Sequence, residues 1–111
     1  RLPPGLHTLE LEWGRFSCVA LGMTMREPRL HHVTENHFST VSQAMQRCFE
    51  RGYRRVGFVF SEANDSPRVG DRWLGAYFRH QLALPEKDRL PVCPGDPADS
   101  TPFAAWVRNG G

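Results

Sequence analysis

Apolar and polar residues follow several patterns in the first third of the chain, and each pattern predicts a different element. Leu9, Leu11 and Trp13 alternate with glutamates, and this period of two favours a short strand or an irregular edge segment. Residues 16–22, FSCVALG, are apolar apart from Ser17, which suits a buried strand. A break at residues 26–28, REP, precedes LHHVTEN, which predicts another short strand over residues 30–35.

The clearest helix is predicted over residues 38–51. Its apolar residues recur at i, i+4, i+7 and i+8 and form one stripe: Val41, Met45, Cys48 and Phe49. Asn36 or Ser39 can cap its start, and Gly52 suits the left-handed position that follows a helix. The sequence therefore gives this helix both a start and a stop.

The segment that follows predicts a parallel sheet. Val56–Phe60 is apolar on both faces, as in a strand covered by helices on both sides. With strand 30–35 and helix 38–51, a strand over 55–60 would complete a right-handed βαβ crossover. Residues 61–66 predict a polar loop, residues 67–83 a helix with a broad apolar face, and residues 101–111 a final short helix. The predicted fold class is α/β, with a mostly parallel sheet and flanking helices.

Composition narrows the class of protein. The chain has 111 residues, of which 40% are hydrophobic and 23% charged, as expected of one small globular domain. It contains no apolar run long enough to span a bilayer and no signal-peptide core, so we expect a cytoplasmic protein. The net charge of +2 is low for a protein whose main partner is a nucleic acid, although all cations except Lys87 are arginines.

The sequence lacks the common patterns of catalysis and metal binding. Cys18, Cys48 and Cys93 are far apart, and the adjacent His31 and His32 would point to opposite faces of a strand. The chain contains no nucleophile elbow, no P-loop and no dinucleotide-binding glycine pattern. We therefore expect no metal, no cofactor and no enzymatic activity.

The order of several short motifs resembles the effector-binding domain of lactose-repressor-type transcription regulators. These motifs are a strand ending in ALG, then VTEN, the helix, RGYRRVGFVF and SPRVGDRWLGAYFRHQL. The resemblance implies a partial periplasmic-binding-protein-like fold and a single partial effector-binding domain over residues 1–111. Residues 1–36 would end the N-terminal lobe and form the crossover, and residues 37–111 would belong to the C-terminal lobe. We expect no DNA-binding domain within these residues, and Glu35 stands where the family usually has aspartate.

The resemblance also implies a site. The family arginine that matches Arg72 reaches into the ligand cleft, and a guanidinium suits ligand hydroxyls or a carboxylate. Ligands of open α/β sheets gather at the carboxyl ends of strands, where Asn36, Ser61, Asn64 and Asp65 follow. The alternatives are a surface arginine paired with Asp71 or Asp65, a plain helix cap at Asn36, and a solvated loop after Phe60.

Two functions from different classes follow. The first is the ligand-sensing and dimerisation portion of a bacterial transcription regulator, which binds a small polar effector such as a sugar or a nucleoside-like molecule. Its partners would be that effector, a second copy in a homodimer, and DNA only through a missing helix-turn-helix, with no membrane. The alternative is a structural or oligomerisation module without retained ligand binding, which presents Trp73, Tyr77 and Phe78 to a partner.

Overall fold

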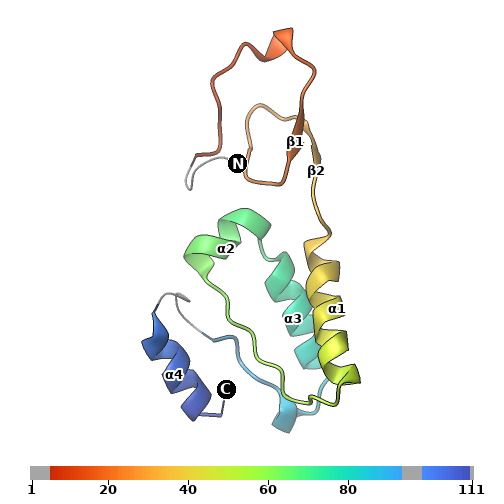
Figure 1. Ribbon diagram of the computed structural model, residues 1–111, viewed down its shortest axis with the longest axis vertical. Coiled ribbons are helices and arrows are strands. Elements are labelled where there is room, and N and C mark those ends of the chain that lie inside the picture. The colour runs from red at the N-terminus through yellow and green to blue at the C-terminus, as the bar shows by residue number, and fades with distance from the viewer. Residues whose placement is uncertain (1–5, 94–98, 111) are drawn as a thin grey trace. The chain divides into compact units, whose positions relative to one another are not determined.

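The computed structural model describes residues 6–93 and 99–110 (Figure 1). The chain divides into two compact units, Arg1–Glu35 and Asn36–Gly111. The first unit carries a two-stranded parallel sheet, and the second carries the α-helices. The mixed α/β composition predicted from the sequence is therefore present.

Two short strands form the sheet of the first unit. Strand β1 (Val19–Leu21) pairs in parallel with β2 (His31–Val33), with Val19 opposite His31 and Leu21 opposite Val33. Both strands lie inside the predicted ranges 16–22 and 30–35. The prediction that the first strand is buried is wrong, because Val19 and Leu21 of β1 are exposed.

Of the two alternatives predicted for residues 9–13, the structure has the irregular segment and not the short strand. The backbone N–H of Trp13 donates to Leu11 O and its indole N–H donates to Leu9 O, so the chain turns locally into the 3-10 helix η1 (Trp13–Arg15). The nearest ladder contact is one isolated bridge between Thr8 and Glu27. The backbone of this segment therefore has no neighbouring strand in the described residues, and it is held by local hydrogen bonds instead.

The predicted helix 38–51 is confirmed as α1 (His37–Glu50). Asn36 caps it by accepting a hydrogen bond from the Ser39 N–H at 3.0 Å. Gly52 has a φ of +88°, and its N–H donates to Phe49 O while the Tyr53 N–H donates to Cys48 O. These two bonds are those of a Schellman motif, so the helix ends by the mechanism that the sequence predicts.

Helix α1 packs beside α3 (Arg72–Leu82), and the two run in the same direction (Figure 1). His37 meets Trp73 edge-on near their starts, with ring centroids 6.0 Å apart, and Phe49 meets His80 near their ends at 6.2 Å. Met45 of α1 and Ala76 and Tyr77 of α3 are buried. The core of the second unit therefore includes this parallel helix pair.

The strand predicted over residues 55–60 is wrong, and with it the βαβ crossover. The segment is extended, but its one described bridge joins Val59 to Cys93. The Gln81 amide donates to Val56 O at 3.1 Å and accepts from the Leu90 N–H at 2.7 Å. The Tyr77 hydroxyl lies 2.9 Å from Leu90 O and 3.2 Å from Val56 O and shares its one proton between them. Side chains of α3 therefore bond backbone groups that a sheet ladder would otherwise pair.

The single helix predicted over residues 67–83 is also wrong. The chain forms α2 (Glu62–Val69), turns at Gly70 and Asp71, and begins α3 at Arg72. Gly70 has a φ of +59°, a left-handed conformation that ends α2. The polar segment predicted to be a loop therefore forms most of α2, because Asp65 secures its start through the Ser61 backbone.

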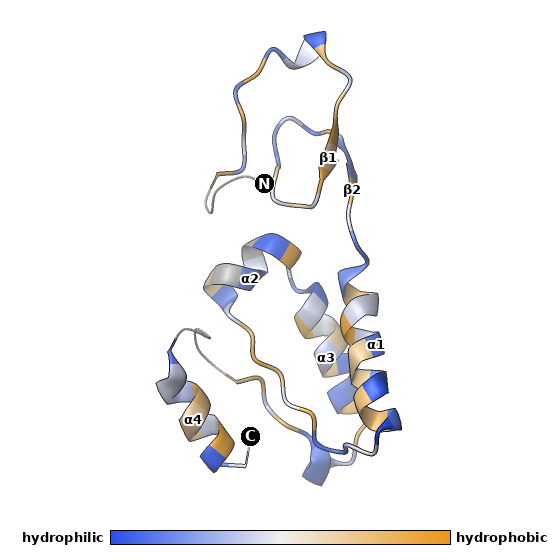
Figure 2. Cartoon of the chain, in the orientation of Figure 1, coloured by the Kyte–Doolittle hydropathy of each residue, from blue (hydrophilic) through white to orange (hydrophobic). Residues whose placement is uncertain are grey.

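Helix α4 (Ser100–Arg108) packs against the apolar segment that Figure 2 shows as a largely orange stretch before α2. The Trp106 ring lies directly over Gly57, where an added Cβ would be 3.0 Å from Trp106 Cζ2 and closer still to Cη2. Gly57 is therefore required for close approach. Within the described ranges, none of the helices has the length and apolar character needed to cross a bilayer.

Candidate functional site

Arg72 is the first residue of α3, directly after the turn that ends α2. Its guanidinium Nη1 donates to Val69 O at 3.2 Å, and the residue is exposed. This bond joins the side chain to the end of α2, and the other donors of the guanidinium make no hydrogen bond to the residues that the structure describes. The alternative of an ion pair with Asp71 or Asp65 finds no support, because no salt bridge links them among the described residues.

Asn36 lies at the same end of the α1–α3 pair as Arg72. The parallel direction of the helices places both starts together, and the His37–Trp73 ring contact joins the residues that follow Asn36 and Arg72. The Asn36 side-chain oxygen caps α1, so the cap alternative is met. The amide nitrogen of Asn36 donates in none of the described hydrogen bonds and is available to a ligand.

Ser61 and Asp65 hold the start of α2. The Asp65 carboxylate accepts from the Ser61 N–H at 3.0 Å, and the Asp65 N–H donates to Ser61 O at 2.7 Å. Ser61 is buried and Asp65 is half-buried. Asn64 lies in α2 between them, and its side chain is outside the described residues. This pair therefore shapes the α2 start, and no described bond links it to Arg72 or Asn36.

His37 and Trp73 are the residues at this end that sequence reasoning did not place in the site. His37 is buried at 7% exposure, and the indole N–H of Trp73 is covered without an acceptor in the described part of the chain. A buried donor without an acceptor costs about 1–3 kcal/mol. Their place in the sequence could have identified them, because His37 directly follows Asn36 and Trp73 directly follows Arg72.

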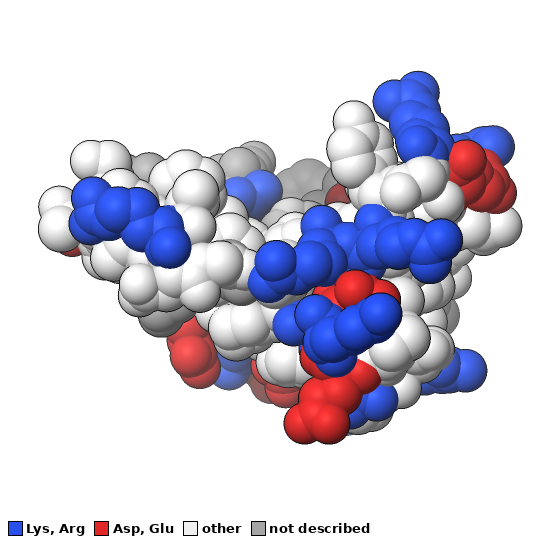
Figure 3. All heavy atoms as spheres, turned by 90° about the horizontal axis from the view of Figure 1, so that it is seen from below, with Lys and Arg blue, Asp and Glu red and all other residues white. Residues whose placement is uncertain are grey.

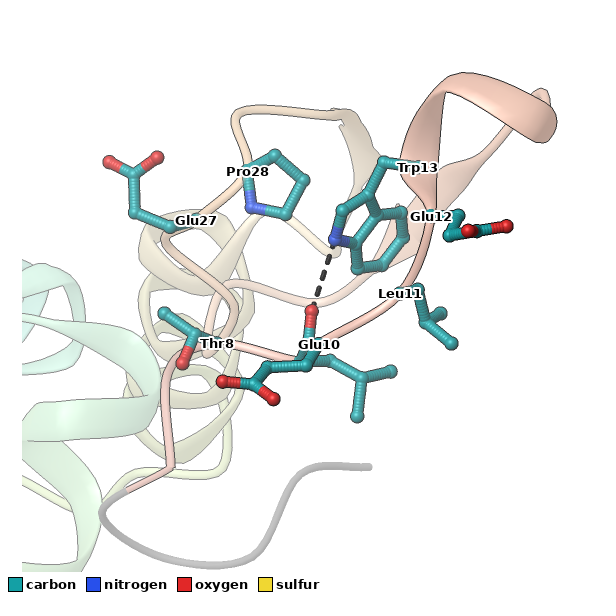
Figure 4. Close-up of a pocket in the computed structure, with 8 residues that line it drawn as sticks. Thr8, Glu10, Leu11, Glu12, Trp13, Glu27 and Pro28 are labelled. Carbon is teal, nitrogen blue, oxygen red and sulfur yellow. Dashed lines mark hydrogen bonds between the residues drawn. The ribbon is translucent and has the colours of Figure 1, made fainter.

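A separate groove lies within the first unit (Figure 4). Its volume is about 540 Å³, and Figure 4 shows the Trp13 ring between Pro28 and Leu11, with Glu10 and Glu27 at the rim. Trp13 is partly exposed, and the face of an aromatic ring can stack on a sugar. None of the predicted effector-binding residues lines this groove.

Comparison of the chain with protein-family models, with curated proteins and with solved structures finds no match. The function is therefore inferred from the residues and their geometry.

Proposed function

We propose that this chain is the ligand-sensing portion of a transcription regulator and binds a small polar effector, such as a sugar, at the start of the α1–α3 helix pair. Arg72 supplies charged donors, and Asn36 supplies an amide beside them. Occupancy would be coupled to the DNA affinity of a helix-turn-helix outside this chain. The family resemblance of the VTEN and VGDRWLGAY motifs supports the regulatory role.

The observation that carries the proposal is the shared location of Asn36 and Arg72. They are 36 residues apart in sequence, yet the parallel helices place both at one end of the second unit. Both are exposed, and both have side-chain donors that make no hydrogen bond to a described residue. Hydroxyl and carboxylate oxygens accept from such donors, and a guanidinium fork can bind two of them at once.

The alternative module would present Trp73, Tyr77 and Phe78 to a partner. Tyr77 has no exposed surface, so a face that requires this residue is excluded. Phe78 is 48% exposed and Leu82 is 68% exposed, and these two remain available to a second copy of the chain. Homodimer formation stays a prediction, and Phe78 and Leu82 are the α3 residues from which we would expect it.

Titration calorimetry with glucose, galactose, ribose, sucrose and adenosine tests the proposal. We expect at least one of these compounds to bind, and Arg72→Ala to weaken its binding by about 10-fold or more, since a charged hydrogen bond contributes about 1.5–3 kcal/mol. Arg72→Lys should restore only part of the affinity, because an ammonium lacks the planar fork.

Arg79→Ala is the matched control. Arg79 is an exposed arginine near the opposite end of the same helix, so its loss should leave the affinity unchanged. If Arg72→Ala and Arg79→Ala bind the compound equally well, Arg72 does not belong to the site. If no compound binds to the wild-type chain while its circular dichroism is that of a folded protein, sugar and nucleoside sensing by this chain is excluded.

A further inference from the structure

The turn after α1 presents an aromatic side chain among arginines. The two bonds of the Schellman motif fix the backbone from Phe49 to Tyr53, and Tyr53 is 63% exposed. Its ring makes no stacking contact with any other described ring. A large aromatic side chain is thus held outward on a rigid turn.

The arginines around Tyr53 fall into two groups. Arg47 donates to Glu50 at 2.8 Å, and Arg55 donates to the backbone oxygen of Gly110, so these two have local partners. Arg51 and Arg54 flank the Tyr53 turn, are exposed, and donate from their side chains to no residue that the structure describes. Arginine in the last turn of a helix complements the helix dipole, but Arg54 lies beyond the helix and has no such role.

Positive charge is concentrated at this end of the helix pair. Between residues 47 and 55 the chain carries four arginines and one glutamate, although the whole chain has a net charge of only +2. Arg79 and Arg89 belong to the same end, because α1 and α3 are parallel and Arg89 donates to Leu82 O and Leu84 O. Figure 3, which views the molecule from below, shows Lys and Arg atoms as a band across this face, with Asp and Glu atoms beside it. The low total charge therefore conceals a local basic surface.

We propose that Arg51, Tyr53 and Arg54 form a contact surface for single-stranded nucleic acid. Bases of a single strand are free to stack on an aromatic ring, and the two arginines would pair with the adjacent phosphates. A duplex hides the faces of its bases, and an acidic peptide has no base to place on Tyr53. The outward ring between unpaired arginines therefore favours a single strand over both.

This surface is independent of the proposed effector site. Arg72 lies at the start of the helix pair and the Tyr53 turn lies at its end, about 20 Å away for a helix of this length. Each surface therefore supplies the control variant for the other: Arg72→Ala should leave nucleic-acid binding unchanged, and Arg54→Ala should leave effector binding unchanged.

Fluorescence anisotropy of a labelled deoxythymidine oligonucleotide of about 15 residues measures the binding. Titrations are repeated between about 20 and 200 mM salt. The logarithm of the association constant, plotted against the logarithm of the salt concentration, should have a slope of about −1.4, because each of the two phosphate contacts contributes about −0.7. Arg54→Ala removes one phosphate contact and should change the slope to about −0.7. Tyr53→Ala removes the stacking ring and should weaken binding by about fivefold or more. Tyr53→Phe keeps the ring and should bind like the wild type.

Three results would overturn the proposal: no binding at the lowest salt concentration, a salt slope that Arg54→Ala leaves unchanged, or a Tyr53→Ala affinity equal to that of the wild type. The last result, combined with equal binding of polyglutamate, would assign the surface to an acidic protein segment instead. The variants change exposed side chains, and unchanged thermal denaturation would show that lost binding is not lost folding.

Discussion

Replacing Gln81 with leucine should destabilise the second unit far more than its modest change in size suggests. The Gln81 amide is buried at 4% exposure and makes two hydrogen bonds, to Val56 O and from the Leu90 N–H. Each contributes about 0.5–1.5 kcal/mol, and the Leu90 N–H left without an acceptor costs about 1–3 kcal/mol. Because Leu90 is only half-buried, water can offset part of this cost. We expect a loss of about 2–4 kcal/mol, a large share of the about 5–15 kcal/mol of a typical domain.

Urea denaturation followed by far-ultraviolet circular dichroism measures this loss, with the midpoint shifted and the slope unchanged. Gln46→Leu is the matched control. Gln46 is exposed on α1, and its amide donates to Glu50 at 3.1 Å. The same substitution there should change the free energy of unfolding by no more than about 0.5 kcal/mol.

If the free energy of unfolding of Gln81→Leu lies within about 0.5 kcal/mol of the wild-type value, the idea that α3 side chains replace a sheet ladder is refuted. The double variant with Tyr77→Phe gives a second check. Both side chains contact Val56 O, so their losses should not be additive. Additive losses would mean that the two side chains act on separate structures.

Two further predictions concern the same core. Burial raises the pKa of Tyr77 from 10.0 to about 12, so the fold favours the neutral phenol; this stabilisation is complete below pH 10 and is lost as the pH rises towards about 12. Denaturation at a series of pH values should show this loss in the wild type but not in Tyr77→Phe, and parallel pH profiles would contradict it. Gly57→Ala would place a Cβ against the Trp106 ring and should destabilise the protein by about 1–3 kcal/mol. The fluorescence emission of Trp106 should shift to the red. An unchanged emission spectrum and an unchanged denaturation midpoint would show that α4 does not pack on Gly57.

Helix α1 was predictable from the sequence because its limits are set locally. Asn36 caps the helix through a residue three positions later. At the other end the Gly52 N–H bonds a residue three positions before it, and the Tyr53 N–H bonds a residue five positions before it. A short sequence window contains all of these groups. The α2–α3 region differs from the prediction because Gly70 stops α2 in mid-segment, and because the polar residues before Pro67 are typical of a loop although they form a helix.

The segment 56–60 could not be predicted in the same way. An apolar run indicates burial, but a strand also needs a partner edge, and that partner is distant in the sequence. The described partner of Val59 is Cys93, and prolines on both sides of Cys93 lack the N–H groups that a longer ladder requires. One local signal was present. Tyr77 and Gln81 are four residues apart on the otherwise apolar side of a helix, which predicts that their polar groups meet backbone atoms.

The candidate site shows the same division between local and distant information. The family resemblance selected Arg72, and the position after a predicted strand selected Asn36, Ser61, Asn64 and Asp65. Only the parallel packing of α1 on α3 brings Asn36 and Arg72 to one end. The oxygen of Asn36 and one oxygen of Asp65 already accept backbone bonds that begin helices. A ligand competing for those oxygens would weaken the helix starts, whereas the outward donors of Arg72 can bind it without such a cost. Arg72 is therefore the residue through which an effector would be bound most strongly.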